Sequence, residues 1–533
     1  MECNATRIAY RQTNAFTSII TDYLDRVAAL QPFYHAFPDL DGIKQAIEAR
    51  QAFPNNRTVL VNELKKQYAQ LKTSVETEKN IAALANATTF TITTAHQPNL
   101  FTGPLYFIYK ILHAIRLAES CKTWLPQYDF VPVYYMGSED ADLDELGHFN
   151  IGGEKKIWNT KQTGAVGRMK IDKELIKLIQ SVEGQLTVLP HGEEILSLVK
   201  DSYFEGRTIQ DATFHLVNAL FAEYGLVILM PDNAALKNGM QKIFEDDLLH
   251  QTASSIVEQT ARKLESAGYK VQANPREINL FYLKDNIRER IELRNDEYAI
   301  LNTQSSFSKD DILKELKENP ERFSPNVILR GLFQETILPN IAFIGGGGET
   351  AYWLQLKDLF QHYKVPFPLL VLRNSFLVVE EKMTDKIEKI GFSLPELFLS
   401  EQELLNKLVQ RDTQQKLKLN GTYTETEQIY DAIRKQASAI DSTLSKHVEA
   451  LKTNTLYRLQ ELEKKMLRAE KRKFGDQQRH IQSIKEKLFP RNGLQERIDN
   501  FMWYYAKWGK EFFRELYRHS LSLEQEFVVL QEQ

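Results

Sequence analysis

The chain has 533 residues, with 67 Lys and Arg against 71 Asp and Glu and a formal net charge of −4. This length predicts three or four domains' worth of material, and the combination of 43% hydrophobic and 26% charged residues excludes wholesale disorder. Two cysteines, Cys3 and Cys121, exclude a disulfide framework and a cysteine-based zinc site. Sparse cysteine and an N-terminus without an apolar leader favour a cytoplasmic protein.

Charge is unevenly distributed along the chain. Residues 81–109 carry no charged side chain, but many threonines and the prolines Pro98 and Pro104 make this stretch too polar for a membrane helix. Residues 464–491 hold ten basic and three acidic residues, a net charge of +7. This basic segment has three interpretations: a solvated helical face, a surface that attracts anionic substrate or nucleotide, and a nucleic-acid site. The negative remainder of the chain disfavours the third.

In chain order, the first 88 residues are predicted to be helical, because apolar residues such as Leu60 and Leu64 recur at helical spacing. Five short apolar runs with strand character follow: 89–94, 130–136, 225–230, 341–344 and 369–372. Helical segments separate them, among them one opened by Pro104 and one over 349–363. This alternation predicts an α/β fold with a mainly parallel sheet, whose ligands bind beyond the carboxyl ends of the strands.

The predicted core spans 89–394, with inserted subdomains at about 149–207 and 269–323. From about Pro395 the pattern changes: Ser400 and Glu403 match a capping box, and apolar residues from Ile433 to Ala469 keep close to a heptad rhythm. We therefore expect an antiparallel helical hairpin or coiled coil over 395–490 that forms a homodimer. Residues 491–533 are expected to form a C-terminal helix that packs back on the core.

Two segments at predicted strand ends are candidates for chemistry. The loop 94–104 presents His96, Asn99 and Thr102, which could bind a polar ligand, although a neutral loop that only turns the chain has the same composition. The acidic segment 138–145 could hold Mg²⁺, bind an amine or act as a base, with Glu139 and Asp140 best placed. Acidic residues in a first helical turn also complement the helix dipole, so both uses stay open.

A third candidate is the glycine run Gly345–Gly348 before Glu349, which lets a backbone approach a ligand closely. It lacks the Gly-Lys-[Ser/Thr] of a P-loop, and Thr350 stands where a dinucleotide fingerprint needs its third glycine. A binding loop of another kind is the favoured interpretation.

Several sequence blocks resemble those of the bacillithiol biosynthesis cysteine-adding enzymes, the cysteine ligases called BshC. The resemblance runs along nearly the whole chain and is most specific at 102–106, 139–142, 321–327, 342–353, 488–490 and 494–497. Two positions depart from the pattern: Ala141 stands where histidine is common, and Gly347 where proline is common.

This resemblance implies a Rossmann-type core like that of class I aminoacyl-tRNA synthetases, with connecting subdomains and a dimerising C-terminal coiled coil. It implies an amide-forming ligase that adds L-cysteine to the glucosamine amine of glucosaminyl-malate, with ATP as co-substrate, with or without Mg²⁺, and no other metal. Neither synthetase signature, HIGH or KMSKS, is intact, so the geometry of adenylation cannot be carried over.

The site residues implied for this activity fall into three groups. The catalytic candidates are His96, Asn99, Glu139, Asp140 and Asp142. The substrate-binding candidates are Thr102, Gly103, Tyr106, Lys110, Arg330, Gln334, Arg373 and Ser375. The nucleotide-binding candidates are Gly345, Gly346, Gly347, Gly348, Glu349, Phe489, Gln495 and Arg497.

Two other functions remain open. Ala141 raises the alternative of a catalytically altered coiled-coil dimer that acts as a partner protein. The chain could also ligate another pair of amine and amino acid. No nucleic-acid or membrane partner is expected.

Overall fold

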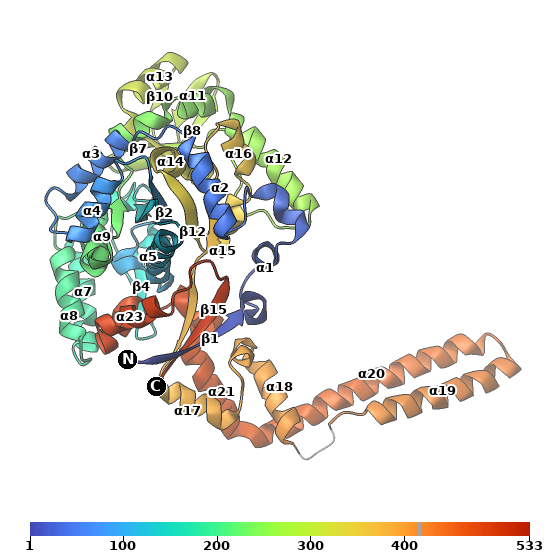
Figure 1. Ribbon diagram of the computed structural model, residues 1–533. Helices are drawn as coiled ribbons and strands as arrows, with labels where there is room; N and C mark the ends of the chain where they lie inside the picture. Colours follow the sequence, from blue (N-terminus) through green and yellow to red (C-terminus); the bar gives the residue numbers. More distant parts are fainter. Residues whose placement is uncertain (414–416) are drawn as a thin grey trace. The chain divides into compact units, whose positions relative to one another are not determined.

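The computed structural model describes residues 1–413 and 417–533 (Figure 1). A five-stranded parallel sheet forms the core of the larger of its two compact units. Its strand order is β13-β12-β2-β3-β6. The strands are β2 (Thr89–His96), β3 (Asp129–Met136), β6 (Val227–Leu229), β12 (Asn340–Gly345) and β13 (Leu369–Leu372). The predicted Rossmann-type parallel sheet is confirmed, and the strands of the core are buried nearly throughout because helices cover the sheet.

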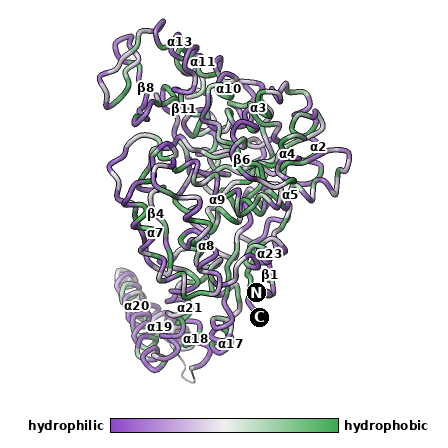
Figure 2. The backbone as a smooth tube through the Cα atoms, turned by 90° about the vertical axis from the view of Figure 1, so that its left-hand side faces the viewer, coloured by the Kyte–Doolittle hydropathy of each residue, from purple (hydrophilic) through white to green (hydrophobic). Residues whose placement is uncertain are grey.

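The sheet's hydrophobic core includes the apolar faces of two helices, α2 (Leu40–Gln51) and α5 (Tyr106–Trp124), which pack on its central strands. Ile43, Ile92, Ala114 and Val371 belong to this core. Figure 2 shows hydrophobic residues gathered around α5 and β6. The other helices of the N-terminal segment are α1 (Ser18–Leu24), α3 (Arg57–Tyr68) and α4 (Val75–Ala83).

The prediction of a helical N-terminal segment is wrong at its beginning. Residues Cys3–Ala9 form a strand, β1, which pairs antiparallel with β15 (Glu526–Glu532) near the C-terminus. The third strand of this sheet is β14 (Ser375–Val379). The predicted helix over 349–363 is also interrupted, forming α15 (Gly347–Trp353) and α16 (Lys357–His362).

The two segments expected as inserted subdomains have structure of their own. The first holds β4 (His148–Ile151), β5 (Glu154–Ile157), α7 (Lys173–Leu186) and α8 (Gly192–Ser202). The second holds an antiparallel sheet of β7 (Leu280–Lys284), β8 (Ile287–Arg294), β9 (Glu297–Ile300), β10 (Ser306–Phe307) and β11 (Phe323–Pro325), with α13 (Lys309–Glu318). The connecting helices are α6 (Leu143–Leu146), α9 (Ile209–Phe221), α10 (Ala234–Lys237), α11 (Gln241–His250), α12 (Thr252–Ser266) and α14 (Val327–Ile337).

The chain divides into two compact units, one of residues 1–378 and 493–533 and the other of residues 379–492. The second unit is helical: α17 (Glu381–Ile390), α18 (Glu401–Asp412), α19 (Asn420–Ile440), α20 (Leu444–Lys471) and α21 (Gly475–Leu488). Ser400 and Glu403 form the predicted capping box of α18. The chain then returns to the first unit with α22 (Phe501–Trp508), α23 (Lys510–Arg518) and β15, where a single helix was expected.

The predicted antiparallel hairpin is confirmed in α19 and α20. Polar contacts join the two helices across their length, among them Tyr430 Oη to Thr455 Oγ1 at 2.7 Å and Lys452 Nζ to Asp431 Oδ1 at 3.2 Å. In the part of the chain that the structure describes, no helix combines the length and apolar character that crossing a membrane requires.

Candidate functional site

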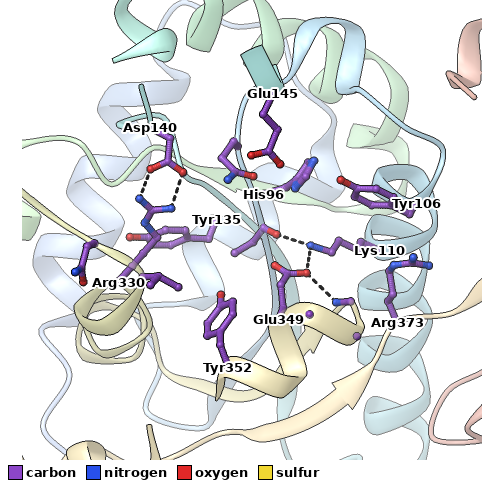
Figure 3. A pocket seen from close by; sticks show the side chains of 18 of the residues that line it. His96, Tyr106, Lys110, Tyr135, Asp140, Glu145, Arg330, Glu349, Tyr352 and Arg373 are labelled. Atoms are coloured by element: carbon purple, nitrogen blue, oxygen red, sulfur yellow. Dashed lines mark hydrogen bonds and ion pairs between the residues drawn. The ribbon is translucent and has the colours of Figure 1, made fainter. Parts of the chain in front are cut away.

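A cavity of about 630 Å³ in the first unit lies at the carboxyl ends of β2, β3 and β12. This is where a parallel α/β sheet binds its ligands. The residues that line it, drawn in part in Figure 3, are Ala95, His96, Gln97, Tyr106, Lys110, Tyr135, Gly137, Asp140, Glu145, Phe281, Arg288, Asn326, Val327, Arg330, Gly346, Gly347, Gly348, Glu349, Tyr352, Arg373 and Arg497.

An ion pair between a buried lysine and a partly exposed glutamate lies in the wall of this cavity. The ammonium of Lys110, on α5, contacts the Glu349 carboxylate at the start of α15 and donates a hydrogen bond to the Ala95 carbonyl at 2.8 Å (Figure 3). Burial lowers the pKa of Lys110, and the charge of Glu349 opposes that shift. Glu349 also accepts a hydrogen bond from Gly346 N at 2.8 Å. The glycine run and the lysine are therefore held together by one carboxylate.

Arg373 contributes a second buried cation to the same side. Its guanidinium donates to both carboxylate oxygens of Glu496, at 3.0 and 2.7 Å, and to Ser375 Oγ at 3.1 Å. Ser375 itself does not line the cavity and instead helps to fix the arginine. Because Glu496 is fully buried, its two hydrogen bonds hold the Arg373 guanidinium in a fixed position at the cavity wall.

Asp140 lies on the other side of the cavity between two arginines. Arg330 binds both of its carboxylate oxygens, with Nη1 to Oδ2 at 2.7 Å, and Arg288 Nη2 lies 3.2 Å from Oδ1 (Figure 3). Burial alone raises the pKa of Asp140, but the charge and hydrogen bonds of Arg330 outweigh it and lower the pKa to about 2. Asp140 is therefore ionised and fully occupied by guanidinium groups.

Among residues 1–413 and 417–533, the buried Nε2 atom of His96 has no hydrogen-bond partner. Burial lowers the pKa of His96 well below its ordinary value, and the positive charges of Lys110 and Arg373 add to the effect. The ring therefore stays neutral, packed against Tyr106 and Phe107. A neutral imidazole beside two cations can exchange hydrogen bonds with a ligand but holds a proton poorly.

The neighbouring loop residues Asn99, Thr102 and Gly103 are buried in the wall behind the cavity and do not line it. Phe101 and Thr102 adopt positive φ angles of 50° and 67°, an uncommon conformation for non-glycine residues. Asn500 Nδ2 donates to the carbonyls of Phe101 and Gly103 at 2.9 and 2.7 Å, which holds this conformation.

Other predicted site residues have structural partners outside the cavity. Glu139 forms a buried ion pair with Lys237, and Asp142 caps α6 by accepting a hydrogen bond from Glu145 N at 3.1 Å. Gln334 donates to Glu335 at 2.9 Å. Gly345 is the last residue of β12, and Gln495 forms hydrogen bonds with the backbone of Val378. Phe489 belongs to the second unit, where its ring packs on Phe398.

Sequence reasoning did not select several lining residues: Tyr135, Glu145, Phe281, Arg288, Asn326 and Tyr352. Phe281 and Arg288 come from the antiparallel sheet in the segment expected to be an insertion. Asn326 is the N-cap of α14 and stands in a block that carried the family resemblance, a signal that could have identified it.

Family models match both parts of the chain. Residues 1–374 match the model described as "Bacillithiol biosynthesis BshC, N-terminal Rossmann-like domain", and residues 376–532 match "Bacillithiol biosynthesis BshC, C-terminal coiled-coil domain". The chain belongs to the BshC family.

Two relatives in this family carry the name "Putative cysteine ligase BshC". The BshC of Flavobacterium psychrophilum is 42% identical over 512 residues, which cover 96% of each chain. That of Flavobacterium johnsoniae is 40% identical over 525 residues, which cover 98% of this chain and 99% of the relative. A solved chain described as a "putative arginyl t-RNA synthetase" from Campylobacter jejuni aligns with 10% identity at a TM-score of 0.22, too low to carry an argument.

Proposed function

We propose that this chain is the ligase that joins L-cysteine to the glucosamine amine of glucosaminyl-malate in bacillithiol biosynthesis, with ATP as the energy source. Family membership and the name of its relatives support a cysteine ligase. The observation that carries the proposal is the cavity at the carboxyl end of the parallel sheet, where Lys110, Arg373 and the glycine run lie on one side.

The chemistry needs an activated carboxylate. The carboxylate of cysteine attacks a phosphorus of ATP and displaces either diphosphate or ADP, giving an acyl adenylate or an acyl phosphate. The amine then attacks the acyl carbon, expels AMP or phosphate and loses one proton. Cationic side chains and backbone N–H groups stabilise the negative charge that develops on the phosphoryl and acyl oxygens. Lys110, Arg373 and the backbone of Gly346–Gly348 are the candidates for this role.

The described residues include no group of three or more His, Cys, Asp or Glu side chains that could hold a metal ion. Of the three carboxylates that line the cavity, Asp140 and Glu349 already have cationic partners, and Glu145 has none among the described residues. A Mg²⁺ that accompanies ATP would therefore take its ligands mainly from phosphate oxygens and water, as this ion often does.

We also propose that two copies associate through the hairpin of α19 and α20. Several of its apolar side chains are exposed, among them Ile440 at 84% and Ile429 at 58%, and the others are Ile433, Leu444, Leu451, Tyr457 and Leu462. An exposed apolar seam on a helical hairpin is typical of a self-association surface.

The test is turnover by purified protein supplied with L-cysteine, glucosaminyl-malate, ATP and Mg²⁺, with the product identified by mass spectrometry. We expect bacillithiol, together with either AMP or ADP in equal amount, which also identifies the intermediate. Reactions that lack one component are the controls. Failure to form product with any nucleoside triphosphate or divalent metal would contradict the proposal, and product from another amine would redirect it.

A further inference from the structure

Most charged side chains that line the cavity have an oppositely charged partner, although Arg330 and Arg288 share one carboxylate. The pairs are Lys110 with Glu349, Arg330 and Arg288 with Asp140, and Arg373 with Glu496. Two charged lining residues remain. Within residues 1–413 and 417–533, neither Glu145 nor Arg497 has an oppositely charged side chain at ion-pair distance or a side-chain hydrogen bond. The Arg497 guanidinium lies over the ring of Phe16, 5.7 Å from its centroid, and both Arg497 and Glu145 are exposed.

These two residues act on the same part of the cavity. Both residues line the cavity that Tyr106 also lines. Burial raises the pKa of Tyr106; the charges of Glu349 and, to a smaller extent, Glu145 raise it further, and those of Arg373 and Arg497 lower it. The Glu145 carboxyl group points into the cavity on the side of His96 and Tyr106 (Figure 3). The cavity therefore offers one free negative group and one free positive group around a single phenol.

The local structure places the backbone of Glu145 at this edge of the cavity. It lies on the short helix α6, whose N-cap Asp142 accepts a hydrogen bond from the backbone N–H of Glu145 at 3.1 Å. Burial raises the pKa of Glu145, and the neighbouring charges of Asp142 and Asp140 raise it further. A cation bound beside this carboxylate would relieve both effects, whereas the paired residues of the cavity would first have to give up a partner.

We propose that Glu145 and Arg497 recognise the two charged ends of a zwitterionic ligand, Glu145 by binding its ammonium group and Arg497 by binding its carboxylate. A guanidinium suits a carboxylate because its planar fork can donate two parallel hydrogen bonds. The inference rests on the proposed function for its choice of ligands, since both L-cysteine and glucosaminyl-malate carry an ammonium group and a carboxylate. It assigns the ammonium to Glu145 and not to Glu139, Asp140 or Asp142.

The experiment compares ligands that lack one charged group, using calorimetry on the purified full chain under reducing conditions. 3-Mercaptopropionate lacks the ammonium of L-cysteine, and cysteamine lacks its carboxylate. The wild type is expected to prefer L-cysteine to each by roughly tenfold or more, the usual effect of losing a hydrogen bond between charged groups. Glu145→Gln should abolish only the preference over 3-mercaptopropionate, and Arg497→Gln only the preference over cysteamine. Asp144→Asn, an exposed carboxylate on the same helix, is the matched control and should change neither.

A second pair of ligands distinguishes the two sources of the zwitterion. Glucosaminyl-malate and glucosyl-malate differ only in the amine, so a Glu145→Gln effect confined to this pair identifies the acceptor sugar as the ligand. The proposal is overturned if the wild type binds none of these ligands, or if Glu145→Gln weakens both members of each pair equally. Turnover is measured separately: product formation with unchanged ligand preferences would refute this inference alone, and altered preferences without product would refute the proposed reaction alone.

Discussion

At the scale of single residues, burial decides which titratable groups can change charge. His113 on α5 is fully buried: its Nε2–H donates to the Ser522 carbonyl at 2.7 Å, and its Nδ1 accepts from Asn374 N at 3.0 Å. Burial lowers the pKa of His113 from 6.5 to about 4. Between these values the unfolded chain binds the proton and the folded chain does not, so stability falls as the pH falls from 6.5 to 4.

We expect His113→Gln to remove this contribution. At pH 7 the variant is less stable than the wild type, because one or both hydrogen bonds and the ring packing are lost. The difference should shrink by up to about 3 kcal/mol as the pH is lowered to 4, since each pKa unit corresponds to about 1.4 kcal/mol. Urea unfolding of both proteins across this range measures it. Parallel stability curves would show that His113 does not titrate as described.

Neighbouring carboxylates of the acidic segment show what sequence reasoning can resolve about a site. Their position after a strand predicted correctly that this segment reaches the sheet's carboxyl edge. It favoured Glu139 over Glu145, whereas Glu145 lines the cavity and Glu139 does not. The difference lies in distant partners: Lys237 pairs with Glu139, and no cation pairs with Glu145 among the described residues. The contact between Arg288 and Asp140 could not be predicted either, because nothing in the sequence around Arg288 indicates that its segment approaches Asp140.

At the scale of elements, the parallel strands were predictable because each is a short buried run between helices. β1 was not, because its pattern is mixed and its partner β15 lies more than 500 residues away. The loop between β2 and α5 was also only partly predictable. Its sequence predicts a turn, but the hydrogen bonds that stabilise the positive φ angles come from Asn500, about 400 residues later in the chain.

The clamp formed by the Asn500 amide on the carbonyls of Phe101 and Gly103 can be tested with Asn500→Asp. Aspartate keeps the acceptor that caps α22 at Met502 N, but replaces the amide donor that binds Phe101 O and Gly103 O with a charge facing two carbonyls. Losing two buried hydrogen bonds should lower the free energy of unfolding by about 2–3 kcal/mol. Thermal unfolding monitored by calorimetry tests this.

The control is Asn56→Asp, which changes an exposed asparagine N-cap that accepts a hydrogen bond from Val59 N at the start of α3. It should alter stability by no more than about 0.5 kcal/mol, because a cap accepts hydrogen bonds equally well as aspartate. Equal losses in both variants would mean that capping, and not the clamp, explains the effect.

At the scale of the whole molecule, the helical unit of residues 379–492 is inserted, in sequence, between the two segments that form the first unit. The residues that flank this insertion in the first unit are in contact: Val378 N donates to Gln495 Oε1 at 3.0 Å, and Gln495 Nε2 donates to Val378 O at 3.2 Å. The cavity is built entirely from residues of the first unit, including Arg497 after the return. The proposed ligand site and the proposed self-association surface therefore belong to separate units.

Replacing residues 380–492 with a short glycine-serine linker should separate these two properties. Because the ends lie in hydrogen-bond contact, a flexible linker can join them without strain. We expect the shortened chain to fold and to have the same affinity for L-cysteine as the full chain. In light scattering we expect the shortened chain to be a monomer and the full chain to be a dimer. The matched control keeps the hairpin and carries Ile433→Glu and Leu451→Glu on its exposed apolar positions, which should also give a monomer. A shortened chain that remains dimeric would place the dimer contact in the first unit, and a monomeric full chain would refute the dimer itself.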